Sequence, residues 1–442
     1  MKRARSSVAN SASAATRLSR VPTAILAHIF SFLDLLAHTR LVGMAKHYHT
    51  AARLPTASPR FVDMTAKPLD AIRHLRPESL VCRPVSAAHV AAIASMTSLR
   101  ALRIHLIPAG VRLDFGPLSK LRLLNQVDMR FPEECGGDDI GFARHLPLLT
   151  RMTTSSRCIH LVSETVRSLS VLSWLDIGRL QHLTALTELR VDIAWDEAEM
   201  LRVGRTCPRL TDLEFSVLRW STAALATPAE FATAFWSLGR LKCSIRDQAD
   251  NPTRLARLVA AITSLRDLTV VDTSTMSLIG SFPPSLQRLD LSGGWFDDAH
   301  VTLVCALREL RTLVLARCRV LADLRRLTDS VALDELDLSD CTGTGAMCLP
   351  RLQTLHITLE LSVASVELSR QWPNLTRLHA SMPLAEAPWY RYAALNPPAS
   401  LTHFITGQPQ LFAGLAARGV IVQRPAPPPA DFPLPVLPCA KN

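Results

Sequence analysis

Hydrophobic and polar residues alternate in a short motif, Leu-x-x-Leu-x-Leu or a close variant, that returns about every 23 residues between residues 99 and 404. Three consecutive copies begin at Leu286, Leu310 and Leu333. Successive side chains of an extended chain point to opposite sides, so the alternating leucines of each copy share one face. The pattern predicts one short strand per repeat, with its leucines buried.

The segments between these strands have the apolar spacing of helices. Ala299–Ala306 and Leu321–Leu327 are two examples, and both are expected to pack on the outer side of the strands. A repeat of this length cannot bury its apolar face alone, so the repeats must stack on one another. We therefore predict an α/β fold, a leucine-rich-repeat solenoid (horseshoe) with parallel strands along its concave wall.

The repeats are assigned to residues 58–420, in about 13–15 units. Phe61–Met64 is predicted to form a first strand, and one or two irregular units are expected between Lys67 and Met96. The interval between the copies at Leu172 and Leu186 is too short for a full unit, so one of these two assignments is doubtful. The copies begin at Leu99, Leu124, Leu149, Leu172, Leu186, Leu210, Leu238, Leu265, Leu286, Leu310, Leu333, Leu352, Leu375 and Leu401.

Polar strand residues that alternate with the buried leucines should face the concave side and provide a substrate-binding surface. Their mixed charges favour a protein ligand over a polyanion. The same positions also fit ordinary solvated strand residues, since few interface residues carry most of the binding energy. The candidates are Glu188, Arg190, Asp192, Arg288, Asp290, Glu335, Asp337, Arg377 and His379.

A different pattern precedes the repeats. From Val21 to Leu33 the apolar residues form one broad helical stripe, and Pro22 occupies the first turn, where a helix tolerates proline. Two further short helices are predicted over Leu35–Gly43 and Met44–Leu54. Residues 18–57 are thus expected to form a small all-α three-helix segment. A unit of this size is near the lower limit for independent folding, so it should rest on a neighbour or a partner.

This helical segment resembles an F-box. The similarity lies in Val21-Pro22-Thr23-Ala24-Ile25-Leu26-Ala27-His28-Ile29-Phe30-Ser31-Phe32-Leu33, followed by Arg40-Leu41. Ala24, Ala45 and Tyr48 stand where the family has an acidic residue, cysteine and tryptophan. An F-box directly followed by leucine-rich repeats is similar to the F-box/leucine-rich-repeat protein family. The phrases ending in Cys318 and Cys341 resemble its cysteine-containing repeats.

The resemblance implies a substrate-recognition subunit of an SCF-type (Skp1-cullin-F-box) ubiquitin ligase. The F-box would dock on a Skp1-type adaptor, and the solenoid would bind a protein substrate. Two alternatives stay open: a non-ligase scaffold whose helical segment only caps the first repeat, and a regulatory binder of a small GTPase or of nucleic acid. The adaptor contact would use Val21, Pro22, Ile25, Leu26, Ile29, Phe30 and Leu33.

Both ends of the chain have biased compositions. Residues 1–17 are rich in Ser, Ala and Arg and contain no acidic residue, which predicts a disordered basic arm. An organellar transit peptide and a nuclear signal are alternatives. Residues 421–442 are rich in proline and are expected to form a disordered tail. A ligand for an SH3-type domain and a cover for the last unit are the alternatives there.

The net charge of +11 comes almost entirely from arginine. The arginines are spread over many loops and aromatic residues make up only 5%, so we expect no specific nucleic-acid binding. No apolar run reaches the roughly 18 residues of a membrane span, and no signal peptide is recognised. The ten cysteines form no Cys-x-x-Cys pair and are expected to be reduced thiols of a cytoplasmic or nuclear protein.

No sequence motif for catalysis is found. The chain has no Gly-rich phosphate loop, no His-Glu-x-x-His, no Gly-x-Ser-x-Gly and no zinc-ligand spacing. We therefore expect no catalytic residue, no metal and no cofactor, and we interpret the protein as a non-catalytic adaptor or receptor.

Overall fold

The computed structural model describes residues 61–64, 77–82, 86–104, 113–129, 137–154, 159, 162–172, 175–219, 227–245, 257–271, 282–329, 332–341, 349–358, 372–381, 398–406 and 413–424. The predicted basic arm, the F-box-like segment with all its adaptor-binding residues, and residues 425–442 of the tail lie outside these ranges. The chain divides into two compact units, residues 1–216 and 217–442, and each is described by itself.

The first unit is a ladder of parallel strands in sequence order. Strands β1 to β7 pair one after another, and the register brings Leu80, Leu102 and Val127 side by side. β1 confirms the first strand predicted at 61–64. The strands are β1 Phe61–Met64, β2 Ser79–Cys82, β3 Ala101–Ile104, β4 Gln126–Met129, β5 Arg151–Thr154, β6 Ser168–Val171, β7 Glu188–Asp196 and β8 Asp212–Arg219, which begins in this unit.

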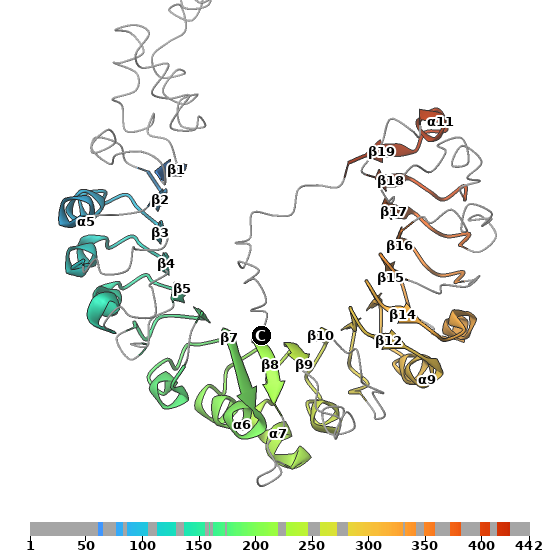
Figure 1. The fold of residues 1–442 in the computed structure, drawn as a ribbon, viewed down its shortest axis with the longest axis horizontal. Coiled ribbons are helices and arrows are strands. Elements are labelled where there is room, and N and C mark those ends of the chain that lie inside the picture. The colour runs from blue at the N-terminus through green and yellow to red at the C-terminus, as the bar shows by residue number, and fades with distance from the viewer. Residues whose placement is uncertain are drawn as a thin grey trace, which may run out of the picture. The chain divides into compact units, whose positions relative to one another are not determined.

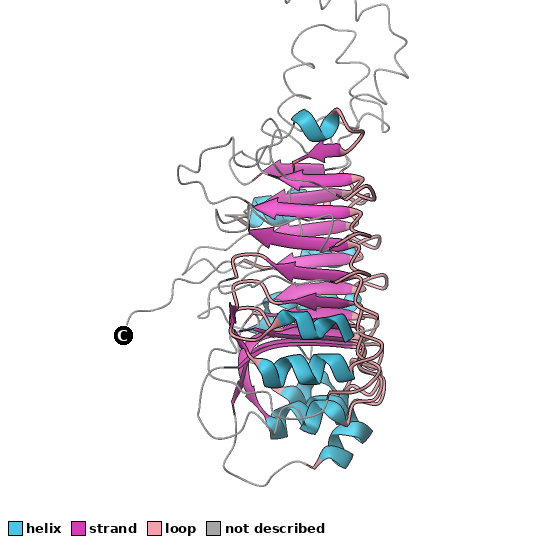
Figure 2. Ribbon diagram, turned by 90° about the vertical axis from the view of Figure 1, so that its right-hand side faces the viewer, coloured by secondary structure: helices cyan, strands magenta, loops and turns pink. Residues whose placement is uncertain are grey.

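The second unit repeats the same design (Figure 2), with parallel strands side by side and turns at the edge where they begin. Its strands are β9 Arg240–Ile245, β10 Asp267–Val271, β11 Arg288–Asp290, β13 Thr312–Val314, β15 Glu335–Leu338, β16 Thr354–Thr358, β17 Arg377–Ser381, β18 His403–Thr406 and β19 Ile421–Gln423. β12 (Trp295–Phe296) and β14 (Arg319–Val320) form a separate two-stranded sheet. β19 extends the ladder into the predicted tail, because Ile421 pairs with His403 of β18.

The core of each ladder consists of stacked rows of aliphatic side chains. Leu80 and Leu102 in the first unit, and Leu313 and Leu336 in the second, are at most 1% exposed. Each such row is continuous because neighbouring strands are in register, so every leucine is covered by the repeats on both sides. The predicted α/β leucine-rich-repeat solenoid is therefore confirmed for the described residues.

One repeat was assigned to the wrong residue. The motif leucine expected at Leu172 lies past the end of β6 and is only half-buried, while Val166 is fully buried two residues before that strand. Val166 thus holds the position that Leu149 and Leu186 hold in the adjacent repeats. A β-branched valine occupies this buried position, and a search for leucine spacing does not detect it.

Helices lie on one side of each ladder (Figure 1), in agreement with the prediction that the segments between the strands pack on their outer side. The predicted helices at 299–306 and 321–327 correspond to α9 and to the 3-10 helix η7. The helices are α5 Ala87–Ala94, α6 Glu197–Thr206, α7 Pro228–Ala234, α9 Asp298–Ala306 and α11 Ala413–Ala416, with 3-10 helices η3 Gly116–Lys120, η4 Gly137–His145, η6 Ile177–Leu180 and η7 Leu324–Asp329. Within the described residues, no helix combines the length and apolarity that a membrane span requires.

Polar side chains connect consecutive turns at the edge where the strands begin. The residue just before the first buried leucine of a repeat often donates a hydrogen bond to the preceding turn. The hydroxyls of Ser264 and Ser400 donate to the carbonyls of Leu238 and Leu375, both at 2.8 Å, and Thr165 donates to the Leu149 carbonyl at 2.7 Å. We call these positions the turn row.

Buried thiols also form hydrogen bonds between consecutive repeats, at positions that follow the strands of the second unit. The thiol of Cys318 donates to the carbonyl of Leu291 at 3.1 Å, and that of Cys341 to the carbonyl of Leu315 at 2.7 Å. Each thiol thereby bonds to the preceding repeat. Burial raises the pKa of the Cys341 thiol to about 12, which keeps it protonated as a donor.

Candidate protein-binding surface

The strand residues proposed as a binding surface lie on the face of each ladder that is turned away from the buried leucines, which we call the open face. In β7, Glu188, Arg190 and Asp192 are exposed and alternate with buried Leu189 and Val191. The other six candidates belong to the second unit. The nine residues therefore provide two surfaces, one on each ladder.

On the open face of the first unit, charged side chains pair across neighbouring strands. Arg190 forms an ion pair with Glu214 of β8, and Asp192 accepts a hydrogen bond from the Ser216 hydroxyl. On β3 and β4, Nε of Arg103 lies 3.3 Å from Oδ2 of Asp128. The charges of Arg190, Asp192 and Arg103 are thus compensated by contacts within the ladder.

The second unit begins its open face with a similar arrangement. Nε of Arg240 lies 3.2 Å from Oδ2 of Asp267, and Nε of Arg288 lies 3.9 Å from the other oxygen of the same carboxylate. On β11, Oδ1 of Asp290 accepts hydrogen bonds from the backbone N–H and the hydroxyl of Ser292. These contacts fix both candidate side chains at the start of the surface.

Further along this ladder, two histidines stack beside a carboxylate. The rings of His356 on β16 and His379 on β17 lie 3.9 Å apart and are inclined by only 15°. Oε1 of Glu335 on β15 lies 3.4 Å from Nε2 of His356, and its other oxygen accepts a hydrogen bond from Thr312. We call Glu335, His356 and His379 the histidine cluster.

The cluster has perturbed acid–base properties. Burial, together with the neighbouring His356, lowers the pKa of His379 to about 4. The hydrogen bond from His356 lowers the pKa of Glu335 below its ordinary value. Near neutral pH Glu335 is therefore charged and His379 is neutral, and acidification towards pH 4 would add positive charge at His379.

The structure brings Glu335 and His379 together through a residue that sequence reasoning did not select. His356 lies between them, and it occupies the polar position of a strand with buried Leu355 and Ile357. The same alternation used for the other candidates would have identified it. Asp337 pairs in register with His356, and Arg377 is exposed at the start of β17.

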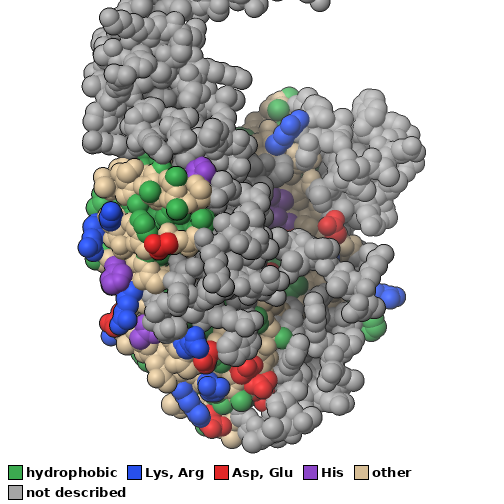
Figure 3. Space-filling model, turned by 60° about the vertical axis from the view of Figure 1, so that its left-hand side comes forward, with side chains coloured by type: hydrophobic (Ala, Val, Ile, Leu, Met, Phe, Trp, Pro, Cys, Tyr) green, Lys and Arg blue, Asp and Glu red, His purple; other side chains and the backbone are tan. Residues whose placement is uncertain are grey.

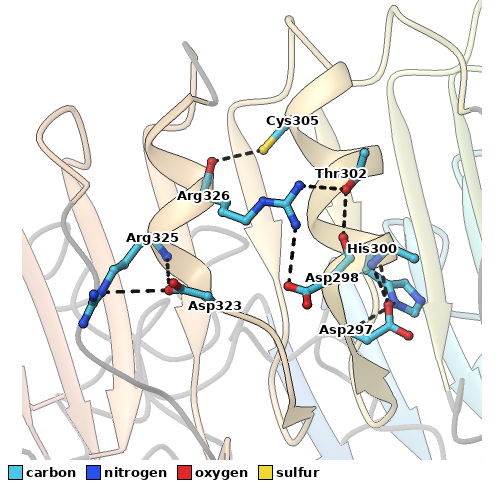
Figure 4. A network of polar contacts seen from close by, with 9 residues as sticks. Asp297, Asp298, His300, Thr302, Cys305, Asp323, Arg325 and Arg326 are labelled. Atoms are coloured by element: carbon cyan, nitrogen blue, oxygen red, sulfur yellow. Dashed lines mark hydrogen bonds and ion pairs between the residues drawn. The ribbon is translucent and has the colours of Figure 1, made fainter.

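The helical side of the second unit carries a separate polar network (Figure 4). Oδ1 of Asp297 caps α9 by accepting from the backbone N–H groups of Ala299 and His300, at 3.0 and 3.1 Å. Arg326 of η7 reaches back to α9, with its guanidinium 3.6 Å from Asp298 and 3.1 Å from the Thr302 hydroxyl. These contacts join consecutive outer segments and so stabilise the stacking of the repeats.

The described cysteines and acidic residues show no arrangement for metal chemistry. Within the described part of the chain, no group of three or more His, Cys, Asp or Glu side chains could hold a metal ion. Burial raises the pKa of Cys207 and of Cys243 to about 12, so these thiols are poor nucleophiles. Among the described residues, no disulfide is formed by Cys82, Cys207, Cys243, Cys305, Cys318 or Cys341.

No protein-family model matches the chain, and no curated protein matches its sequence. Among solved structures, it is similar to an internalin (inlF) from Listeria monocytogenes, with 14% identity, 81% of this chain and 88% of that chain covered, and a TM-score of 0.35. It is also similar to TLR13 in its complex with ssRNA13, with 15% identity, 82% and 52% coverage, and a TM-score of 0.38.

A third similar structure is the mouse RP105/MD-1 complex, with 17% identity, 75% of this chain and 61% of that chain covered, and a TM-score of 0.43. At these low TM-scores the similarity carries no argument about function. The assignment of the fold rests on the parallel ladders and their buried leucine rows.

Proposed function

We propose that the protein is a non-catalytic leucine-rich-repeat scaffold that binds a polypeptide on its open faces. One observation carries the proposal: in each ladder, alternate strand positions leave rows of polar side chains on the face that the helices do not cover. Charged and hydrogen-bonding groups at strand spacing suit the recognition of a protein surface, because they fix register and exclude mismatched partners.

The histidine cluster is the part of these faces best suited to a specific contact. Its members are held in place by neighbouring strands, so little side-chain entropy would be lost on binding. We expect crosslinking in cells to capture polypeptides on the wild-type protein. The variant Glu335→Ala/His379→Ala should no longer capture them. The matched control is Asp323→Ala/Arg325→Ala, a partly exposed pair on the helical side. Identical capture by all three proteins would contradict binding at this face.

A finer proposal is that the scaffold is the substrate-recognition subunit of an SCF-type ubiquitin ligase. Its support is the F-box-like motif from Val21 to Leu33, which directly precedes the repeats. The segment would hold a Skp1-type adaptor, while the ladders hold the substrate at high effective concentration near the ubiquitin donor. Such a complex would work in the cytoplasm or the nucleus.

Co-expression with a Skp1-type adaptor tests this finer proposal. The full chain should co-elute with the adaptor, and Ile29→Asp/Phe30→Asp should abolish co-elution while the repeats keep their circular-dichroism spectrum. A folded protein that never co-elutes would leave the alternative, a scaffold whose helical segment only caps the array. In that case Leu26→Asp should lower the melting temperature of the repeats.

A further inference from the structure

The turn row of the first unit is interrupted at two consecutive repeats. In the other described turns the residue before the first buried leucine is polar, charged or alanine, as in Ser98, Thr165 and Ser264. In the turns before β4 and β5 it is leucine, at Leu123 and Leu148. These side chains cannot donate the hydrogen bond that Thr165 and Ser264 make to the preceding turn.

Both leucines face solvent. Leu123 is 42% exposed and Leu148 is 50% exposed, and they are the two large hydrophobic side chains found exposed among the described residues of the first unit. The two turns that carry them are in register, because Gln126 pairs with Arg151 in the strands that follow. The leucines are thus neighbours in one row, separated by about 5 Å, the spacing of adjacent strands.

Basic residues lie within four positions of each leucine in the chain. Lys120 ends η3 and Arg144 lies in the last turn of η4, the 3-10 helices that lead into these two turns, and Arg122 directly precedes Leu123. Arg122 is held in place, since its Nη1 donates to the carbonyl of His145 at 3.0 Å. Figure 3 shows Lys, Arg and His side chains along the left margin of the first unit, with hydrophobic side chains beside them.

We propose that Leu123 and Leu148, with Lys120, Arg122 and Arg144, form a second docking surface for an acidic amphipathic helix of a partner protein. The spacing of the leucines matches the 5–6 Å between side chains at i and i+4 of a helix, so apolar residues of such a helix would pack against both. Carboxylates flanking its apolar stripe would meet the basic side chains.

An extended peptide fits this edge poorly. Strand addition needs unpaired backbone groups, but here consecutive turns bond to each other. The N–H of Asn125 donates to the Arg100 carbonyl at 2.8 Å, and that of Thr150 to the Asn125 carbonyl at 2.9 Å. Side chains therefore carry the recognition, which favours a helix.

The test uses the full chain and a fluorescent helical peptide with leucines at i, i+3, i+4 and i+7 and glutamates at most other positions. We expect it to bind, and Leu123→Ser/Leu148→Ser to weaken binding by about tenfold or more. Serine restores the residue type of the turn row, so the melting temperature should not fall. Leu321→Ser, at a leucine that is 56% exposed in the second unit, is the control and should bind like the wild type.

Three results would overturn the proposal: no binding of the acidic peptide, equal binding of a matched lysine peptide, or equal binding by the double serine variant. Leucine-dependent binding to phosphatidylserine vesicles without peptide binding would also overturn it, in favour of a lipid surface. If the double variant loses its fold, Arg122→Glu/Arg144→Glu provides the same test through charge, with weaker binding of the acidic peptide expected.

Discussion

The open faces of the two units are built on the same leucine ladder and differ in how their charges are balanced. In the first unit, Arg190 pairs with Glu214 and Arg103 with Asp128. Guanidinium groups stay charged at every pH at which the fold survives. The second unit has a similar pair, Arg240 with Asp267, and in addition Glu335 beside His356, which stacks on His379, a histidine whose pKa burial lowers to about 4.

The difference shows that a repeat architecture separates stability from surface chemistry. The buried rows of both units hold the strands in register, so the alternate positions are free to vary from repeat to repeat. One ladder can therefore carry a surface that responds mainly to salt, and the other a surface that responds to pH as well.

The largest expected effect is the loss of stability when a leucine is removed from the buried row, which both units share. Leu189→Ala and Leu336→Ala each remove a side chain that is at most 2% exposed. Each should lower the free energy of unfolding by about 2–5 kcal/mol, because the neighbouring repeats close only part of the cavity. Urea unfolding followed by circular dichroism measures both. A cost well below this range in one unit only would show that the buried rows are not equivalent.

A smaller effect is the pH dependence of stability that His379 gives to the second unit. The folded-state pKa of His379 is about 4, below its ordinary 6.5, so the unfolded chain binds more protons between these values. Stability should therefore fall as the pH drops from 6.5 towards 4, by on the order of 1 kcal/mol because the ring is partly exposed to solvent. Below about pH 4.5, protonation of Glu335 should remove the stabilisation that its lowered pKa reflects.

His379→Gln supplies the control for this prediction. It keeps a polar side chain but cannot titrate, so the melting temperature should change less between pH 6.5 and 4 than it does in the wild type. An unchanged pH profile in this variant would mean that other groups cause the acid sensitivity.

The smallest expected effect concerns the ion pair of the first unit. Arg190→Ala should cost no more than about 1 kcal/mol, since Arg190 is 46% exposed and water screens its attraction to Glu214. Thermal melts at low and high salt should show the difference from the wild type shrinking as salt increases. A larger, salt-independent loss would indicate that the arginine acts mainly through packing of its aliphatic part.

Particular residues show how far sequence reasoning reached. The motifs at Leu286, Leu310 and Leu333 predicted strands that the structure contains as β11, β13 and β15. Strand alternation also placed Glu188, Arg190 and Asp192 correctly on the polar side of β7. Their role in binding, like that of the other candidates, stays a prediction, as do the F-box and its adaptor.

The sequence by itself determined the repeat, its strands and the inward side of each strand, because these follow from local alternation and from the need to bury leucine. Only the tertiary structure decided which polar side chains meet. His356 joins Glu335 to His379, which lie about two repeats apart in the chain, and Leu123 stands beside Leu148, about one repeat away. Such contacts depend on the register between strands, which packing of the whole ladder sets and no single repeat encodes.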